Sequence, residues 1–373
     1  MGDVLIEAQR DPAEIIASSG LTSEPKNQAR DESSLKKPPT CSVCIANYNG
    51  MALIDACLRS VLEQDCGFSV EIIVHDDAST DGSADHIAEH YPDVVLIRAS
   101  ENVGFCIANN RMVAAANGEY ILLLNNDAEL FPDALRFLLA EARHLGRPAI
   151  LGLPQYDAET GKLLDRGSLL DPFLNPVPNL DANRSEVGLI MGACLWLTKA
   201  LWNELGGFPE WFGSIGEDLF LCCRARLSGY SVRVLDRSGF RHRVGGSFGG
   251  GKVTRQQRLS TTFRRRALSE RNKTFVMALI YPIPALLFLL PLHVTLLLLE
   301  GALLSLIRWN HRFLTTIYLP VIAALWKQQR RLSSLRQEIQ LNRRNGTARV
   351  GSVFSPLPHK LVLLARHGLP EVK

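Results

Sequence analysis

Short apolar runs alternate with helix-like segments along the chain from residue 41 onward. The strand-like runs are "CSVCIAN" (41–47), "VEIIVHD" (70–76), "VVLIRA" (94–99) and "EYILLLNN" (119–126). The helix-like segments are 51–62, 81–91, 104–116 and 132–145. Continuous apolar runs of this length are typical of strands that are buried on both faces. The alternation predicts an α/β fold, in which a doubly wound, mostly parallel sheet carries helices on both faces.

Polar residues follow three of these four strands. They are Asn47-Tyr48-Asn49, Asp76-Asp77 and Asn125-Asn126-Asp127. In sheets of this kind the ligand binds beyond the carboxyl ends of the strands. A hard divalent cation prefers oxygen ligands and commonly joins one or two carboxylates to substrate phosphates. The pattern therefore predicts a site for a metal and a phosphorylated ligand, with Asp127 as a metal ligand.

The pattern becomes less regular after residue 151. Residues 154–186 contain four prolines and are typical of a long excursion, where substrate-specific loops occur. Apolar order returns in 187–208, in a helix at 216–229 and in a strand at 230–236. In the helix at 216–229, Phe220 lies on the apolar face, and Asp218 is expected to point away from it.

A long apolar segment lies near the end of the chain. Residues 274–299 contain no Asp, Glu, Lys or Arg, a length sufficient to cross a bilayer of about 30 Å. Basic residues flank it on both sides, with Arg271 and Lys273 before it and Arg308 and Arg312 after it. The distribution of positive charge therefore selects no orientation. A single membrane span and a hairpin or in-plane helix both remain open.

A basic segment, 327–346, follows the apolar one. Leu332, Leu335 and Ile339 form a thin apolar stripe among its arginines and lysines. Such a stripe favours a helix that lies on anionic lipid headgroups, and the alternative is a solvated basic helix packed on the preceding domain. The glycine-rich "VGGSFGGGK" at 244–252 is expected to be flexible.

The first 39 residues are polar and charged, without the pattern of a signal peptide, and predict a disordered or loosely helical leader. The chain then divides into an α/β domain (40–252), a basic and apolar membrane-associating helical region (253–349) and a tail (350–373).

Charge and cysteine content exclude some functions. The net charge of +3 is a small excess of 41 basic over 38 acidic residues, which does not indicate a nucleic-acid partner. The eight cysteines are irregularly spaced, and several lie in apolar runs, as expected for reduced thiols in a cytosolic protein. Cys41 and Cys44 form a CxxC, but residues three apart on a strand point to opposite faces, which disfavours a zinc or redox site.

Eight motifs, in order, resemble those of the family-2 glycosyltransferases of GT-A fold. They are "VCIANYNG", "CLRSVLEQ", "EIIVHDDASTDGS", "ENVGFCIANN", "GEYILLLNNDAEL", "GACLWLTKALWNELGGF", "GEDLFLCCRARLSGY" and "RHRVGGS". The resemblance spans roughly residues 41–248 and is strongest to the rhamnosyltransferase-like branch. It implies a Rossmann-like domain with a donor half at 40–130 and an acceptor half at 131–252.

The resemblance implies roles for individual residues. Those implied to contact the donor nucleotide are Tyr48, Asp76, Asp77, Asn102, Gly104 and Asn126. "NND" occupies the place of the family's DxD motif, so Asp127 would bind Mg²⁺ or Mn²⁺, with His242 as an additional ligand. Glu217 and Asp218 occupy the place of the catalytic carboxylate.

Two positions depart from the family pattern. Asn125 replaces the first Asp of DxD, which leaves metal binding to Asp127 with help from His242. Ala46 replaces a common Thr. Each assignment also has a structural alternative, since Asp127 is placed to cap the helix near 131 and Asp218 to stabilise the start of its own helix. Taken alone, His242 is more typical of an ordinary half-buried histidine than of a ligand.

The chemistry of sugar transfer requires the residue types found. Negative charge develops on the departing diphosphate, which a divalent cation stabilises, and the acceptor hydroxyl needs a base. Asp218 suits the base, and a single in-line displacement would invert the anomeric centre.

The sequence thus predicts an inverting, metal-dependent transfer of one sugar from a dTDP- or UDP-sugar, with dTDP-rhamnose favoured by resemblance. The acceptor would be a glycan or lipid-linked molecule of cell-surface polysaccharide synthesis. The C-terminal region would hold the protein at the cytoplasmic face of the membrane.

Three other functions fit the sequence less well. A sugar nucleotidyltransferase would carry a glycine-rich loop after the first strand, where "ANYNG" has one glycine. A processive polysaccharide synthase would carry QxxRW, which the sequence lacks. A non-catalytic relative that serves as a binding module is disfavoured by the presence of both Asp127 and Asp218.

Overall fold

The computed structural model describes residues 38–243, 250–253, 259–344 and 352–373, which belong to one compact unit. The predicted leader lies outside the described residues up to residue 37. So do residues 244–249 of the glycine-rich segment and the first two residues of the predicted tail.

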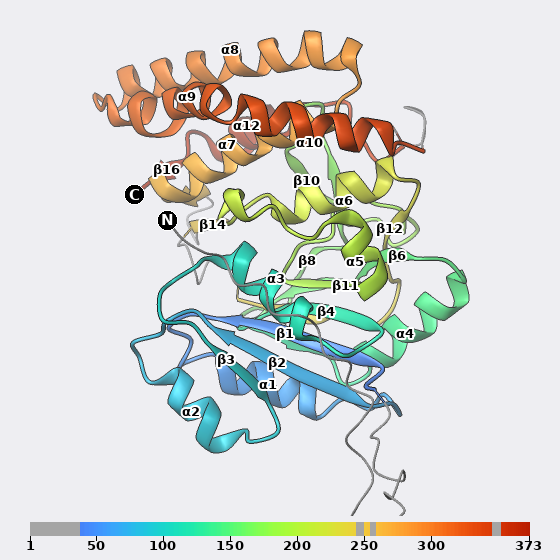
Figure 1. The fold of residues 1–373 in the computed structure, drawn as a ribbon. Helices are drawn as coiled ribbons and strands as arrows, with labels where there is room; N and C mark the ends of the chain where they lie inside the picture. The colour runs from blue at the N-terminus through green and yellow to red at the C-terminus, as the bar shows by residue number, and fades with distance from the viewer. Residues whose placement is uncertain (1–37, 244–249, 254–258, 345–351) are drawn as a thin grey trace, which may run out of the picture. The chain divides into compact units, whose positions relative to one another are not determined.

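A seven-stranded sheet with the order β12-β6-β11-β4-β1-β2-β3 forms the centre of the fold (Figure 1). Its strands are β1 (Cys41–Asn47), β2 (Val70–Asp76), β3 (Val95–Arg98), β4 (Tyr120–Asn125), β6 (Ala149–Gly152), β11 (Cys194–Thr198) and β12 (Ser231–Val234). Neighbours are parallel except where β11 pairs antiparallel with β4 and β6, so the mostly parallel sheet is confirmed. Strand β11 differs because no helix crosses over between β6 and β11, and the chain re-enters the sheet from the edge where β6 ended.

Helices cover both faces of this sheet, as predicted. Helices α1 (Ile54–Leu62), α2 (Ser83–His90) and α4 (Ala134–Leu145) contribute to one apolar core, and α3 (Phe105–Ala115), α5 (Lys199–Leu205) and α6 (Glu217–Leu227) to the other. Cys41 belongs to the first core and Cys44 to the second, so the two thiols of the CxxC are buried on opposite faces. Local chemistry sets the ends of α5, since Thr198 accepts the N–H of Leu201 (3.1 Å) and Gly206 ends the helix in the left-handed region.

The expected excursion at 154–186 is more ordered than the sequence indicates. It contains β7 (Gln155–Asp157), β8 (Leu163–Asp165), β9 (Ser168–Leu170) and β10 (Pro176–Pro178). Strands β7 and β8 join β5 (Ala128–Leu130) and β13 (Phe240–His242) in a second sheet of order β5-β13-β7-β8, and β9 pairs with β10. Strands of three residues give too short an alternation to be read from sequence. A 3-10 turn, η2 (Glu210–Phe212), precedes α6.

The C-terminal region is a stack of helices. It comprises α7 (Phe263–Ile280), α8 (Ile283–Ile307), the π-helical segment η3 (Phe313–Tyr318), α9 (Leu319–Lys327), α10 (Gln329–Leu341) and α12 (His359–His367). The short strands β14 (Gly250–Val253), β15 (Leu259–Thr261) and β16 (Glu371–Val372) form a third sheet. Figure 1 shows α8 as the outermost helix of the stack, with α7 between it and the layer that contains α6.

The single apolar segment expected at 274–299 is two structures. Residues 275–280 are the end of α7, and all of them except Ala278 are buried in the core shared with α6. The chain turns at Tyr281, because the proline at 282 disfavours the helical conformation for the residue before it. Helix α8 then begins at Ile283, and it is the one described helix that is long and apolar enough to cross a membrane by length and composition.

The basic helix α10 packs on the protein. Leu332 and Ile339 are buried in the core, and the side chains of Arg336 and Gln340 donate to the carbonyl of Leu279 (3.3 and 3.0 Å). The last carbonyls of α7 have no partner within their own helix, and α10 supplies the donors. The expectation that this apolar stripe lies on lipid is therefore wrong, and the alternative of a packed basic helix is confirmed.

Candidate active site

Three strand ends are joined by one chain of buried hydrogen bonds. Asn47, at the end of β1, donates through Nδ2 to Oδ1 of Asp76, at the end of β2 (2.9 Å). Asn126, just after β4, donates to Oδ1 of Asn47 (2.9 Å). A Cβ added to Gly50 would lie 2.1 Å from Oδ1 of Asn47, so glycine is required for this close approach. The structure thus brings the polar strand ends together, as the topology predicts.

Asp77 holds the segment that leads into α3. Its two carboxylate oxygens accept the backbone N–H groups of Val103 (2.7 Å) and Gly104 (2.9 Å). Gly104 has a φ of +88°, which glycine adopts without strain. Asn102 is exposed beside this segment, and Tyr48 is 53% exposed next to Asn47 in the chain. Asp77 therefore holds the backbone at 103–104, next to the predicted nucleoside contacts Asn102 and Gly104.

Asp127 and His242 form a buried pair. Asp127 follows β4, and His242 ends β13, where the register sets it opposite Ala128 of β5. Oδ1 of Asp127 and Nε2 of His242 are consequently 3.1 Å apart. Helix α4 begins at Ala134 and Asp133 occupies its N-cap position, so Asp127, six residues earlier, is not the cap of that helix.

Gln155 of β7 contacts the other ring nitrogen of His242. Its Nε2 lies 3.1 Å from Nδ1 of His242, while its Oε1 is buried and has no hydrogen-bond partner within the described residues. A half-turn of the amide exchanges these two atoms, so that Oε1 accepts a proton from Nδ1. Nε2 of His242 then carries no proton and directs its lone pair toward Asp127. A histidine that binds a metal has such an unprotonated ring nitrogen. In this orientation the amide of Gln155 fixes the ring of His242 in the form that fits a cation held by Asp127 and His242.

This pair is small for a metal site. Among the residues that the structure describes, no group of three or more His, Cys, Asp or Glu side chains is placed to hold a metal ion. Mg²⁺ needs few protein ligands when it also binds substrate phosphates and water. Asp127 and His242 thus fit a cation that arrives with a phosphorylated ligand.

Glu217 and Asp218 form the first turn of α6, near the end of β4. Oδ2 of Asp218 accepts the N–H of Gly192 (3.1 Å), and Oδ1 accepts the N–H of Leu219 (2.7 Å). The next residue, Ala193, accepts the N–H of Asn125 (3.1 Å). The pair of residues 192–193 therefore joins the start of α6 to the strand end that carries "NND".

The two neighbouring acids have different surroundings. Glu217 is buried and its Oε2 has no hydrogen-bond partner among the described residues. Burial and the charge of Asp218 raise the pKa of Glu217 well above its ordinary value. Burial also raises the pKa of Asp218, but the N–H groups of Gly192 and Leu219 oppose this by favouring the ionised form. The backbone donors therefore favour a negative charge on Asp218 over one on Glu217.

Arg265 is a site residue that the sequence did not indicate. It lies in the first turn of α7, where Thr262 caps the helix by accepting the N–H of Arg265 (3.2 Å). Burial lowers the pKa of Arg265, and the charges of Asp218 and Glu217 act on it in the opposite direction. Its guanidinium has no hydrogen-bond partner in the described part of the chain. The sequence shows three consecutive arginines at 264–266, but no sequence pattern indicates which of them lies near Glu217 and Asp218.

Comparisons with known proteins identify the family of the chain. The models of "Glycosyl transferase family 2" and "Glycosyl transferase family group 2" match residues 42–197 and 120–327. The second match covers more than half of the chain. The chain belongs to the family-2 glycosyltransferases.

Two relatives show how far the similarity extends. This family-2 glycosyltransferase is 27% identical over 207 residues to the N-acetylglucosaminyl-diphospho-decaprenol L-rhamnosyltransferase of Mycobacterium tuberculosis, which covers 47% of this chain and 67% of the relative. It is 33% identical over 189 residues to the chondroitin synthase of Escherichia coli, which covers 50% of this chain and only 26% of the relative. The chain therefore matches about a quarter of the length of the larger relative.

A solved structure supports the fold. The crystal structure of GalNAc-T7 with UDP, GalNAc and Mn²⁺ matches with a TM-score of 0.51 and 15% identity, over 65% of this chain and 48% of the other. The predicted α/β architecture of GT-A type is thus confirmed. The family match also removes the nucleotidyltransferase alternative.

Proposed function

We propose that this glycosyltransferase moves one sugar from a nucleoside-diphosphate donor to a glycan or lipid-linked acceptor, with inversion at the anomeric carbon. The observation that carries the proposal is the convergence of three elements at one edge of the sheet. These elements are the buried strand-end network, the Asp127–His242 pair and the carboxylates at the start of α6. We place this activity in cell-surface polysaccharide synthesis.

The donor side fits a nucleotide sugar. Buried amides and carboxylates at the ends of β1, β2 and β4 offer directed hydrogen bonds, and Asp77 fixes the adjoining segment at 103–104. The solved relative was crystallised with UDP, and the mycobacterial relative is named as a rhamnosyltransferase. A dTDP- or UDP-sugar is therefore the donor class that we propose, with dTDP-rhamnose to be tested first.

The chain's own residues divide the chemical work. The Asp218 carboxylate accepts the proton of the acceptor hydroxyl, and its hydrogen bonds to Gly192 and Leu219 hold it in place. The unpartnered guanidinium of Arg265 offers positive charge on the same side of the site. Glu217 stays protonated, so it adds no second negative charge beside the base.

Asp127 and His242 would hold Mg²⁺ or Mn²⁺, and Gln155 would fix the ring of His242. A divalent cation bound there supplies positive charge for the departing diphosphate. The presence of Mn²⁺ in the GalNAc-T7 crystal supports this choice of cofactor.

We further propose that the protein works at the cytoplasmic face of the membrane, through its C-terminal helices. Helix α8 satisfies the length and composition of a membrane segment, and the mycobacterial relative is named for a polyprenyl-linked acceptor. Nucleotide sugars are soluble, so a transferase that joins them to a lipid-linked acceptor must meet both at such a surface.

The experiment is a donor panel. Purified protein is incubated with dTDP-rhamnose and a set of UDP- and GDP-sugars, with Mn²⁺, Mg²⁺ or EDTA, and release of the nucleoside diphosphate is measured. We expect one donor to turn over in a metal-dependent way. Asp127→Ala should abolish this turnover, whereas Glu129→Gln, a matched acid two residues away, should retain it.

The outcomes separate the alternatives. Product anomers resolved by NMR test inversion, and a retained configuration would refute it. Nucleotide binding without turnover of any donor would favour a non-catalytic binding module. Turnover that survives both EDTA and Asp127→Ala would contradict the metal assignment.

A further inference from the structure

Helix α8 presents a continuous apolar face away from the protein. The outward side chains lie on one helical stripe, and their exposed fractions run from 37% for Leu292 to 72% for Leu306. The stripe consists of Phe288, Leu292, Leu296, Leu299, Leu303 and Leu306. At about 1.5 Å per residue, the 25 residues of α8 are roughly 37 Å long. An apolar surface of this length on one side of a soluble domain marks a site of interaction.

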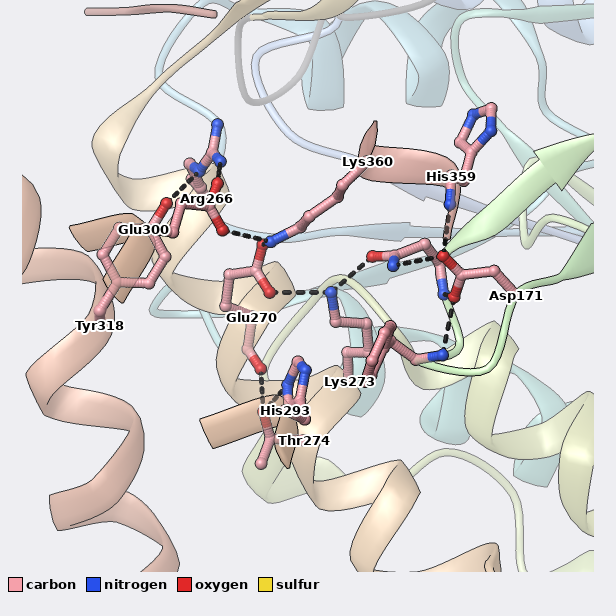
Figure 2. A network of polar contacts seen from close by, with 12 residues as sticks. Asp171, Arg266, Glu270, Lys273, Thr274, His293, Glu300, Tyr318, His359 and Lys360 are labelled. Atoms are coloured by element: carbon pink, nitrogen blue, oxygen red, sulfur yellow. Dashed lines mark hydrogen bonds and ion pairs between the residues drawn. The ribbon is translucent and has the colours of Figure 1, made fainter. Parts of the chain in front are cut away.

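The opposite face of α8 is tied to the protein by polar contacts, which Figure 2 shows. His293 lies 2.9 Å through Nε2 from the hydroxyl of Thr274 in α7. Glu300 is the only charged residue of α8. One of its carboxylate oxygens accepts a hydrogen bond from the guanidinium of Arg266 in α7, and the other accepts one from the ammonium group of Lys360 in α12 (2.9 Å for Lys360). These partners fix the rotation of α8 about its own axis.

The network continues below α8 without a break. Glu270 pairs with both Lys360 and Lys273 (2.8 Å for Lys273), and Lys273 donates to Oδ1 of Asn175 (2.6 Å). Asp171 accepts the backbone N–H of His359 (2.7 Å), as Figure 2 also shows. Helices α7, α8 and α12 and the loop at 171–175 are therefore held together by paired charges and hydrogen bonds.

Apolar packing completes the inner face. Leu297 and Leu304 are buried against residues of η3, and a Cβ added to Gly301 would lie 2.5 Å from the Tyr318 ring. The glycine thus allows α8 to approach η3 closely. From His293 to Leu304, one side of α8 is covered by protein and the other side is open.

Exposed aromatic and basic residues lie just after α8 and at the junction of α9 and α10. Trp309, just after α8, is 95% exposed, and Trp326, at the end of α9, is 75% exposed. Exposed basic residues stand beside them: Arg308 and Arg312 at the first, and Lys327, Arg330 and Arg331 at the second. Tryptophan is enriched at the boundary between lipid and water, and arginine and lysine bind anionic headgroups.

We propose that α8 lies flat in a single leaflet of an anionic membrane, with its outward stripe in the lipid and the two tryptophans at headgroup level. If α8 crossed a bilayer, Glu300 and its partners Arg266 and Lys360 would lie at the depth of the hydrocarbon, where charged groups are costly. A flat helix instead leaves this network within the protein. The inference rests on the proposed membrane location and specifies its geometry, which the sequence left open.

The test measures the depth of three positions along α8. Single cysteines at Phe288, Leu296 and Leu306 receive nitroxide labels, in a Cys66→Ala background because the other seven cysteines are buried. Depth is read from collisions with oxygen and with a water-soluble nickel complex, on vesicles of phosphatidylcholine with phosphatidylglycerol. A label at Glu89, exposed on α2, is the control that should remain in water.

We expect the three labels to lie at one shallow depth, about 5–10 Å below the headgroups. A label at 296 that is deepest, with 288 and 306 shallow, would show a spanning helix and overturn the proposal. Labels that stay in water on vesicles, with a dimer or a bound protein in solution, would show that a protein covers the stripe. Label depth does not depend on catalysis, so a failed donor assay would refute the proposed activity without affecting this result.

A second comparison tests the headgroup rim. Replacing Arg308 and Arg312 together by Gln should reduce binding to phosphatidylglycerol vesicles by about 10-fold while leaving weak binding to pure phosphatidylcholine unchanged. Arg98→Gln, an exposed arginine in β3, is the matched control and should bind as wild type. Equal binding of the double variant and wild type to both vesicles would contradict the role of charge.

Discussion

Buried acids in two regions of this protein have opposite surroundings. In the candidate active site, Glu217 and Asp218 lie side by side, and burial raises the pKa of both. In the network beneath α8, burial acts on Glu270 in the same sense, but the ammonium groups of Lys273 and Lys360 outweigh it. The pKa of Glu270 therefore lies well below its ordinary value. One region has acids in excess of their partners, and the other has its acids paired.

The difference separates a site that waits for ligands from a structural connection. Near α6, Oε2 of Glu217 is buried and has no hydrogen-bond partner among the described residues, and the half-buried guanidinium of Arg265 makes no hydrogen bond to them. Buried polar groups without partners are rare in folded proteins and call for an explanation. A bound sugar nucleotide and its cation would supply the missing contacts. Beneath α8 the partners are already present, so that region holds helices in place.

The largest effect is expected from Asp218→Asn. Removal of the base should lower kcat by about 10³-fold, within the range for a single proton-transfer group, while the donor KM changes little. Steady-state kinetics with the donor identified in the panel measure both. Asp236→Asn changes an exposed aspartate and should leave kcat intact. If the kcat of Asp218→Asn stayed within tenfold of wild type, Asp218 would not be the catalytic base.

The next effect is on stability, from Glu270→Gln. Lys273 would be left buried without its counter-ion, which costs about 3 kcal/mol of unfolding free energy at pH 7. The folded pKa of Glu270 is lowered, so its contribution is present above the ordinary glutamate pKa of about 4.3 and is lost as the pH falls below it. The difference between wild type and variant should therefore shrink in acid.

Urea unfolding at pH 7 and at acid pH provides the measurement for Glu270→Gln. Glu338→Gln is the matched control, because Glu338 pairs with Arg224 but its side chain is 52% exposed. That exposed pair should contribute about 0.5 kcal/mol. Equal losses of unfolding free energy in the two variants at pH 7 would mean that the network beneath α8 contributes no more than an exposed ion pair.

A third prediction concerns metal affinity. Gln155→Leu removes the acceptor for Nδ1 of His242 and should weaken Mn²⁺ binding in the presence of nucleoside diphosphate by about 10- to 100-fold. Gln155→Glu keeps an acceptor and should bind at least as well as wild type. Titration calorimetry reads the affinity without any turnover. Wild-type affinity in Gln155→Leu would show that the amide does not position the histidine.

The sequence predicted the parts of the site that local pattern determines. Apolar runs locate the strands, and the rule for parallel sheets places Asn47, Asp76 and Asn126 at one edge. Gln155 and His242 are 87 residues apart, and their contact depends on the pairing of β7 with β13. Short strands in a proline-containing segment give too little periodicity to predict such a pairing. The role of Arg265 could not be predicted either, because its position depends on how α7 packs near α6.

Hydropathy also has a physical limit in the C-terminal region. The residues at 275–280 and those of α8 are similarly apolar, yet the first group is buried in protein and the second has an exposed stripe. Composition measures the preference for leaving water and does not distinguish a protein interior from lipid. Only the structure shows which apolar face remains open.

The smallest effect is expected from Glu217→Gln. This variant tests most directly whether the acids of the active site differ from those beneath α8. The folded pKa of Glu217 is raised, so wild type loses stability as the pH rises above the ordinary value of about 4.3, and the glutamine variant does not. The nearby Arg265 offsets part of the burial, and we expect the variant to be more stable by about 1 kcal/mol at pH 8 and equal at pH 4, since one pKa unit is worth about 1.4 kcal/mol.

Urea unfolding at the two pH values measures this gain, and kcat is determined on the same samples. Glutamine resembles a protonated glutamate in shape and charge, so kcat should stay within about tenfold of wild type if Glu217 is neutral in the working enzyme. The same change of Glu to Gln would then stabilise the protein at residue 217 and destabilise it at residue 270. A loss of stability at both positions would mean that Glu217 has a charged partner, and the active site would no longer differ from the network beneath α8.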